Sequence, residues 1–182
     1  MSRRKYARAG IAAVVVGVAA AIAVPAMAAA PAKVTQKVVG GGKFVPNRSV
    51  SDTMHFKLDR INVRKGGTIS LVNTTDAPHS FSLVTKRQVP RKLAAVDACF
   101  EKGPCRQLAI DHGAINPVTG EEQDPTTPLV NKGKAGFNQP GDSVLLAPHG
   151  KAKVKVTSAK ALYFICAIHP WMLAAITAPA PR

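Results

Sequence analysis

Four side chains in this sequence have the chemistry of a soft metal site. Cys166, His169 and Met172 follow one another at intervals of three residues, so one loop after a strand can point all three at a single ion. Pro170 within this run disfavours a continuing strand or a long helix and favours a defined loop. A fourth ligand must come from elsewhere, and His79 is well placed because it opens a strand directly after a proline-ended loop.

One thiolate, two imidazoles and a distant thioether form a ligand set that favours copper and supports cycling between Cu(I) and Cu(II). Cys166 taken alone, in an apolar strand, would more often be a small buried side chain, and Met172 alone would more often fill a gap in packing. Together with His79 and His169 at these positions, they predict a site for one copper ion.

The run from Cys166 to Met172, Cys-Ala-Ile-His-Pro-Trp-Met, resembles the ligand loop of the cupredoxins, the type 1 blue-copper proteins, particularly their amicyanin and plastocyanin-like branch. The segment Ala-Pro-His ending at His79 is similar to the one that supplies the first histidine in that family. The resemblance covers about residues 44–84 and 143–177. It implies an all-β, Greek-key β-sandwich with copper held at one end.

By this resemblance His79, Cys166 and His169 are the strong equatorial ligands, and Met172 is the weak axial ligand. Family members commonly carry an asparagine directly after the first histidine, where it helps to tie the two ligand segments together. This chain has Ser80 at that position. We expect the Ser80 hydroxyl to substitute for the asparagine and to support the ligands from behind.

Alternating apolar residues predict β-strands joined by tight turns. The predicted strands cover residues 54–58, 61–63, 68–72, 79–84, 143–146, 151–156 and 162–165. Residues 85–142 are instead rich in proline, glycine and charge, with one helix-compatible piece over 91–100, and we expect a long irregular insertion. We therefore predict a cupredoxin-like domain over residues 44–182, preceded by a flexible lead-in over 29–43. Residues 33–42 of this lead-in have the pattern of a short strand or of a tether that ends in three glycines.

The three cysteines divide into a pair and a single residue. Cys99 and Cys105 are separated by five residues that include a Gly-Pro turn signal, so we predict a disulfide between them. Cys166 is then left unpaired in an apolar run, where metal binding would protect its thiol from oxidation.

The N-terminus has the pattern of a secretory signal peptide over residues 1–28. Basic residues precede an apolar run over 11–24, and a small-residue cleavage pattern follows it. The apolar run is shorter than a membrane-spanning helix requires. We expect an exported protein, periplasmic, envelope-associated or extracellular, with no transmembrane segment in the mature chain; an uncleaved anchor is the alternative.

Residues 29–182 carry 21 Lys and Arg against 10 Asp and Glu, a net charge of +11 that attracts anionic partners. Nucleic acid, an anionic envelope and an acidic protein are the candidate partners, and most of these lysines are expected to form a generally solubilising surface. Nucleic acid is disfavoured, because export and only nine aromatic residues do not suit a base-stacking surface. Lys151, Lys153 and Lys155 alternate along one strand and suggest a protein partner with an acidic docking surface. Trp171, next to a predicted ligand, would contribute an apolar docking patch.

The predicted function is to carry single electrons between a redox donor and acceptor, as a monomer and not as an enzyme. Copper oxidases and nitrite reductases need further histidine-rich copper centres, and in the oxidases histidines flank the ligand cysteine. Cys166 has Ile165 and Ala167 as neighbours, and the chain has five histidines. A copper-binding carrier or a non-cycling β-sandwich binding protein remains open. We expect His112 and His149 to be solvated.

Overall fold

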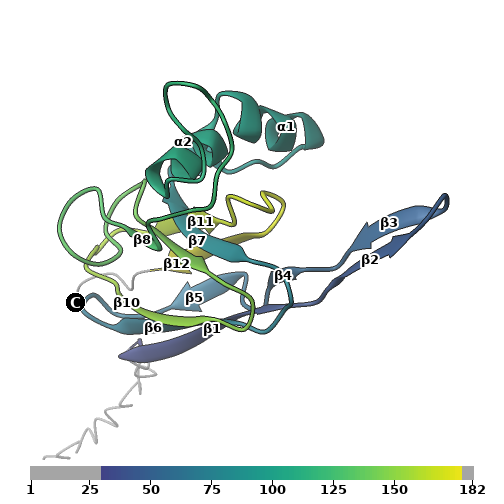
Figure 1. Ribbon diagram of the computed structural model, residues 1–182. Coiled ribbons are helices and arrows are strands. Elements are labelled where there is room, and N and C mark those ends of the chain that lie inside the picture. Colours follow the sequence, from purple (N-terminus) through teal and green to yellow (C-terminus); the bar gives the residue numbers. More distant parts are fainter. Residues whose placement is uncertain (1–29, 178–182) are drawn as a thin grey trace, which may run out of the picture.

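The computed structural model describes residues 30–177, in which two β-sheets face each other around an apolar core (Figure 1). The predicted all-β sandwich with a long insertion is confirmed. The predicted signal peptide lies outside the described residues. Within residues 30–177, no helix is long and apolar enough to cross a membrane.

The first sheet has four strands in the order β10-β6-β1-β4, and the second has six in the order β5-β12-β11-β7-β9-β8. Parallel pairing joins β1 to β6 and β5 to β12, while the other neighbours are antiparallel. The bounds are β1 (Lys33–Val39), β4 (His55–Phe56), β5 (Arg60–Asn62), β6 (Thr68–Asn73), β7 (His79–Val84), β8 (Leu129–Val130), β9 (Ser143–Leu146), β10 (Lys151–Lys155), β11 (Leu162–Ile165) and β12 (Leu173–Thr177).

Three buried phenylalanines hold the two sheets together. Phe56 of the first sheet lies 4.9 Å, ring centroid to ring centroid, from both Phe81 and Phe164 of the second. Tilted contacts of this kind contribute about 0.5 to 1.5 kcal/mol each beyond the area they bury. The metal-ligand candidate His79 precedes Phe81 by two residues on β7, so it points to the same face of the sheet as this aromatic cluster.

The predicted flexible lead-in is wrong for residues 33–39, which form β1 in the interior of the first sheet. Gln36 interrupts the apolar pattern of this segment, yet it is fully buried. Its side-chain amide donates to the carbonyl of Leu58 at 2.6 Å and its side-chain oxygen accepts from the Leu58 amide at 2.9 Å. A buried polar side chain with both groups bonded behaves as a core residue.

A two-stranded hairpin of β2 (Gly42–Val45) and β3 (Ser49–Asp52) follows β1 and projects from the sandwich (Figure 1). The chain turns into it at Gly40, whose φ of +97° and close approach to the Thr53 carbonyl both require glycine.

The insertion is more ordered than predicted. A short 3-10 helix, η1 (Lys86–Gln88), leads into α1 (Leu93–Glu101) and α2 (Pro104–Asp111). The second helix was not predicted, because Gly103-Pro104 indicates a turn, whereas proline is also favoured in the first turn of a helix. The sulfur atoms of Cys99 and Cys105 are 2.00 Å apart and join the two helices by a disulfide.

Both helices lie over the outer face of the second sheet (Figure 1). Cys99, Cys105 and Leu108 pack there against Val84 and Ile165 in a second apolar cluster. All six residues of β7 are buried as a result. Outward-facing side chains of that strand therefore meet protein instead of water.

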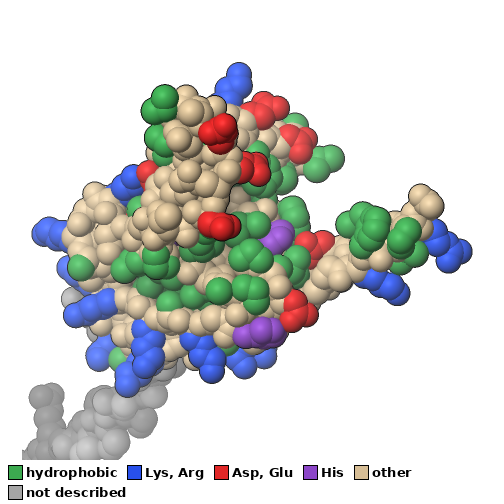
Figure 2. Space-filling view, viewed as in Figure 1, with side chains coloured by type: hydrophobic (Ala, Val, Ile, Leu, Met, Phe, Trp, Pro, Cys, Tyr) green, Lys and Arg blue, Asp and Glu red, His purple; other side chains and the backbone are tan. Residues whose placement is uncertain are grey.

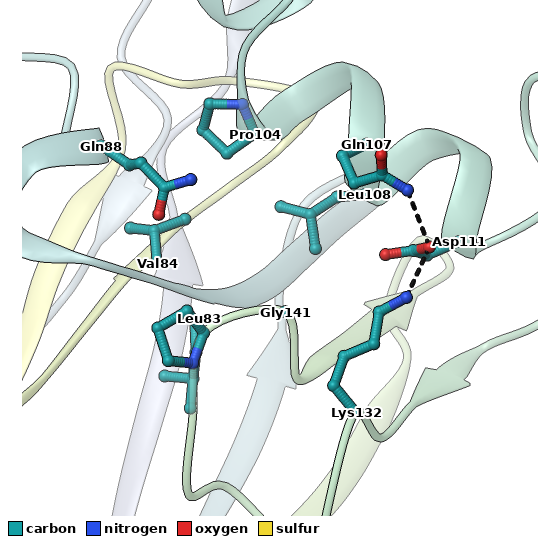
Figure 3. A pocket seen from close by; sticks show the side chains of 10 residues that line it. Leu83, Val84, Gln88, Pro104, Gln107, Leu108, Asp111, Lys132 and Gly141 are labelled. Carbon is teal, nitrogen blue, oxygen red and sulfur yellow. Dashed lines mark hydrogen bonds and ion pairs between the residues drawn. The ribbon is translucent and has the colours of Figure 1, made fainter.

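A polar contact adds to this docking of α2. The carboxylate of Asp111 accepts from Lys132 Nζ at 2.7 Å and from the Gln107 side-chain amide at 3.1 Å (Figure 3). Asp111 thereby ties the end of α2 to the segment that follows β8.

Candidate metal centre

The structure brings three of the four predicted ligands together at one end of the second sheet. Cys166 Sγ lies 3.6 Å from His79 Nδ1 and 3.7 Å from His169 Nδ1, and the two histidine nitrogens are 3.1 Å apart. His79 and Cys166 are fully buried, and His169 is half-buried. Within residues 30–177 this is the one cluster of histidine, cysteine and carboxylate side chains with metal-site spacing.

The spacing of these atoms fits a soft metal ion. Ligand bonds of about 2.0 Å to nitrogen and about 2.3 Å to sulfur, at 120° to each other, separate the ligand atoms by about 3.5 to 3.7 Å. The two sulfur-to-nitrogen distances match that value, and the nitrogen-to-nitrogen distance is shorter by a few tenths of an ångström. One thiolate and two imidazoles in this arrangement are typical of a trigonal copper site.

Cys166 follows directly after β11, and its sulfur accepts a hydrogen bond from the backbone N–H of Ser80 at 3.3 Å. Burial raises the pKa of the Cys166 thiol, while hydrogen bonds from Ser80, His169 and Ile168 lower it by a smaller amount. The metal-free cysteine is therefore a neutral thiol near pH 7.

Thr75 fixes the tautomer of His79. Its hydroxyl donates to Asn73 Oδ1 at 2.9 Å and so has its lone pairs free to accept from His79 Nε2–H, also at 2.9 Å. The proton on Nε2 leaves Nδ1 as the nitrogen that faces Cys166. Burial and the nearby His169 lower the pKa of His79 to about 4, so the ring is neutral and ready to bind metal. Thr75 was not predicted as a site residue, because its only signal in the sequence is its place in the polar loop before His79.

The chain after β11 turns back on itself through Pro170. The amide of Met172 donates to the His169 carbonyl at 2.9 Å, and the Cys166 amide donates to the Met172 carbonyl at 3.1 Å. These two bonds close the predicted ligand loop. Met172 is 1% exposed and packs in the main core, where its backbone is bonded to the two other ligands of the loop.

A hydrogen bond donated by the loop to the opposite ligand segment also holds it in place. The backbone N–H of Ala167 donates to Ser80 Oγ at 2.7 Å. Ser80 thus contacts the second ligand segment twice, through its own amide to Cys166 and through its hydroxyl to Ala167.

Trp171 lies at the surface beside the site. Its side chain is 46% exposed, and its ring meets that of His169 edge-on, with centroids 5.2 Å apart. The half-buried His169 and its aromatic neighbour form the outer side of the cluster.

Surface charge is divided between the two parts of the domain. Seven of the ten acidic residues lie between residues 85 and 142. Figure 2 shows acidic side chains gathered over the insertion and basic ones over the sandwich. Lys151, Lys153 and Lys155 are all exposed on β10 of the first sheet, alternating with half-buried Ala152 and buried Val154.

Of the remaining histidines, His149 is exposed as predicted and lies 2.9 Å from Asp76. His55 is also exposed on β4. The prediction for His112 is wrong, because this residue is only 3% exposed. It ends α2 and turns inward against β9, where Ser143 Oγ meets its Nε2 at 2.7 Å. A helix end flanked by glycine resembles a solvated turn in sequence, and the contact with β9 is visible only in three dimensions.

No protein-family model matches the sequence, and a search of curated proteins finds no match. Among solved structures, the chain is similar to a purple cupredoxin from Nitrosopumilus maritimus, at 10% identity over 80% of this chain and 98% of that one, with a TM-score of 0.41. It is similar to auracyanin from Roseiflexus castenholzii at 14% identity, over 82% and 98%, with a TM-score of 0.41. A blue copper oxidase from Nitrosomonas europaea matches at 12% identity over 80% of this chain and 43% of that one, with a TM-score of 0.35.

At these identities and TM-scores the similarities assign neither a family nor a role. The chain's own strands form a two-sheet sandwich with one histidine at the start of β7 and a cysteine-containing loop after β11, which is the cupredoxin-like arrangement that the sequence predicted. The structures named here do not specify the amicyanin or plastocyanin-like branch.

Proposed function

We propose that this protein is an exported type 1 copper protein that carries single electrons between a donor and an acceptor. The observation that carries the proposal is the buried group of His79, Cys166 and His169, whose ligand atoms lie within 3.1 to 3.7 Å of one another. Met172 is proposed as the weak axial ligand, because it closes the same loop as Cys166 and His169 and its side chain is buried in the same apolar cluster as Cys166.

Copper bound by such a set would supply reversible one-electron chemistry. The protein's own contribution would be to keep the ligands fixed, so that gain or loss of an electron moves few atoms. Ser80 bonds to the cysteine segment, Thr75 orients His79, and the two backbone bonds of the 166–172 loop restrain His169 and Met172. Support of this kind around the ligands is what tunes a metal site.

Electrons would enter and leave at His169. It is the one ligand that is not fully buried, and the exposed Trp171 lies against its ring. The exposed lysines of β10 belong to the other sheet and would orient an acidic partner through the wider field of the sandwich. We propose no catalytic residue, since Ile165 and Ala167 flank the ligand cysteine without a further histidine.

The test is the optical and EPR spectrum of the mature protein after loading with Cu(II). We expect an intense blue band from thiolate-to-copper charge transfer and a narrow copper hyperfine splitting. Both signals should be lost in Cys166→Ser and in His79→Ala. The matched control is His55→Ala, an exposed histidine on β4 whose loss should leave the spectrum unchanged.

A colourless protein, or a copper signal that survives both ligand substitutions, would overturn the proposal. Met172→Leu tests the axial role of Met172 independently of the roles of His79, Cys166 and His169. It should keep the blue band and raise the reduction potential, because removing a weak axial donor favours Cu(I). An unchanged potential would assign Met172 to packing alone.

A further inference from the structure

A continuous chain of buried hydrogen bonds runs from the cysteine loop to the insertion. Ala167 N–H donates to Ser80 Oγ at 2.7 Å, and Ser80 Oγ lies 2.9 Å from Ser82 Oγ. Ser82 Oγ is 2.6 Å from Ser143 Oγ, which in turn is 2.7 Å from His112 Nε2. The chain therefore joins the residue after the ligand Cys166 to a titratable ring on α2.

The alternation of side chains along β7 explains why these hydrogen bonds form a continuous chain. His79, Phe81 and Leu83 are the larger side chains of the strand, and Phe81 and Leu83 pack in the main core. The two serines between them point to the opposite face, which the insertion covers. All three serines of the chain are 0% exposed and His112 is 3% exposed. Because these hydroxyl groups are buried, each of them donates its proton to another member of this hydrogen-bonded chain or to a neighbouring protein atom.

Neutral His112 fixes the direction of every bond. The carbonyl of Thr127 can only accept, so it takes the proton of His112 Nδ1 and leaves Nε2 as an acceptor. Ser143 then donates to His112, Ser82 donates to Ser143, and Ser80 donates to Ser82. All the hydroxyl protons point away from the cysteine loop.

Protonated His112 reverses that direction, because both ring nitrogens then donate. Ser143 accepts from Nε2–H, donates to Ser82, and Ser82 donates to Ser80. Ser82 can then no longer accept the hydroxyl proton of Ser80. The Cys166 sulfur already accepts from the Ser80 backbone N–H at 3.3 Å, and hydrogen bonding from the Ser80 side chain is among the causes that lower the pKa of the Cys166 thiol and so favour the thiolate.

We propose that His112 is a positioning residue for the copper site, which acts through Ser143, Ser82 and Ser80 on the hydrogen bonding of Cys166. This proposal rests on the proposed function and deepens it. A hydrogen bond to a metal-bound thiolate withdraws electron density from it and favours Cu(I), so the reduction potential rises when His112 takes up a proton. The device links the electron affinity of the centre to pH.

Four charged groups surround His112 from the neighbouring elements. Asp111 is the adjacent residue of α2, and its carboxylate is paired with Lys132 from the segment after β8. Arg106 of α2 and Glu122 of the following loop line the same pocket as His112. Strands β7 and β9 present serines to it. Burial lowers the pKa of His112, whereas the Thr127 carbonyl and Asp111 raise it.

His112 lies at the wall of that pocket, which has a volume of about 590 Å³. Its walls also include Ser80, Ala167 and Ile168, so it lies between the insertion and the cysteine loop. A buried ring at the wall of such a cavity can exchange protons without unfolding of the domain.

The experiment measures the reduction potential of the copper-loaded protein between about pH 4 and about pH 8, the range in which a histidine titrates. At a fixed applied potential, the ratio of Cu(I) to Cu(II) should rise about tenfold as His112 becomes protonated, the effect of one hydrogen bond to a charged group. This rise should be absent in Ser82→Ala, which interrupts the chain, and in His112→Gln, which can bond to Ser143 but does not titrate.

His55→Gln is the matched control and should retain the wild-type curve, because His55 is exposed and outside the chain. Any titration of other groups is common to all four proteins and cancels in the comparison. Parallel curves for the wild type and Ser82→Ala would overturn the proposal. The blue band tests the proposed function separately. If copper is bound as proposed, the band is present whether or not His112 affects the reduction potential.

A second readout needs no copper. In the metal-free protein, the amide proton of Ala167 should change its NMR shift with the protonation of His112, because Ser80 is its acceptor. The shift should become independent of His112 in Ser82→Ala. An Ala167 amide that ignores the His112 titration in the wild type would overturn the inference even if the copper site is blue.

Discussion

The hydroxyl of Ser80 accepts a hydrogen bond from the backbone amide of Ala167 at 2.7 Å, although 87 residues separate them in the sequence. Ser80 follows the proposed ligand His79, and Ala167 follows the proposed ligand Cys166. The bond therefore couples the two segments that would supply the metal ligands. It gives this chain the tie that the cupredoxin resemblance assigns to an asparagine at the same position.

We expect Ser80→Ala to weaken copper binding without unfolding the domain. Removal of a group that supports metal ligands typically costs 10- to 100-fold in affinity. The measurement is the rate of copper transfer to a chelator, with the EPR hyperfine splitting as a second readout. Ser70→Ala, a half-buried serine on β6 of the other sheet, is the control and should transfer copper at the wild-type rate. Equal rates for the two variants would show that the bond to Ala167 does not support the ligands.

The grouping of His79, Cys166 and His169 was predictable because its signal is local. Spacings of three residues within 166–172, and a proline before His79, are properties of short segments. Strand β7 was predicted with its observed bounds for the same reason, since alternation over six residues is a local pattern.

The contacts that support the ligands were not predictable, because they join segments far apart in the sequence. The serines of β7 have the pattern of a solvated strand face, and only the packing of the insertion buries them. Strand β1 was misassigned for a related reason, since Gln36 looks solvated until Leu58 supplies both of its hydrogen-bond partners.

Metal loading near neutral pH should release about one proton per copper ion. Burial raises the pKa of the Cys166 thiol, so the thiol must lose its proton to bind. The lowered pKa values of His79 and His169 mean that both rings are already neutral and release none. Calorimetric titration with Cu(II) in buffers of different ionisation enthalpy gives the number. A value near zero would mean that Cys166 is a thiolate before it binds metal.

The metal-free protein should become less stable as the pH falls. The ordinary pKa of His79 is 6.5, and in the folded protein it is about 4. Between these two pH values His79 therefore binds more protons in the unfolded chain than in the folded one. The free energy of unfolding therefore decreases from about pH 6.5 to about pH 4 and is unaffected by His79 above that range. The pKa of His112 and of His169 is also lowered by burial, and both act in the same direction.

Urea unfolding of the metal-free protein at several pH values measures this dependence. His79→Gln should flatten the curve, whereas His55→Gln, at an exposed position, should keep its slope. Carboxylates contribute equally to all three proteins and drop out of the comparison. Superimposable slopes for the wild type and His79→Gln would show that His79 is protonated in the folded state.

The exposed lysines of β10 provide a test of electrostatic steering. Replacing Lys151, Lys153 and Lys155 together by alanine should slow the oxidation of the reduced copper protein by hexacyanoferrate(III), a small anionic oxidant. Removing three positive charges should also flatten the salt dependence of that rate, because screening then has less attraction to weaken. Stopped-flow measurement at several ionic strengths gives both quantities.

The matched control removes three positive charges from the insertion, by replacing the exposed residues Lys86, Lys92 and Lys102 with alanine. Both triple variants change the net charge by three, so any difference between them reports on where the charge lies. The β10 variant should show the larger loss of rate and of salt dependence. Equal effects would mean that net charge alone attracts the oxidant, and a wild-type salt response in the β10 variant would exclude these lysines from the docking surface.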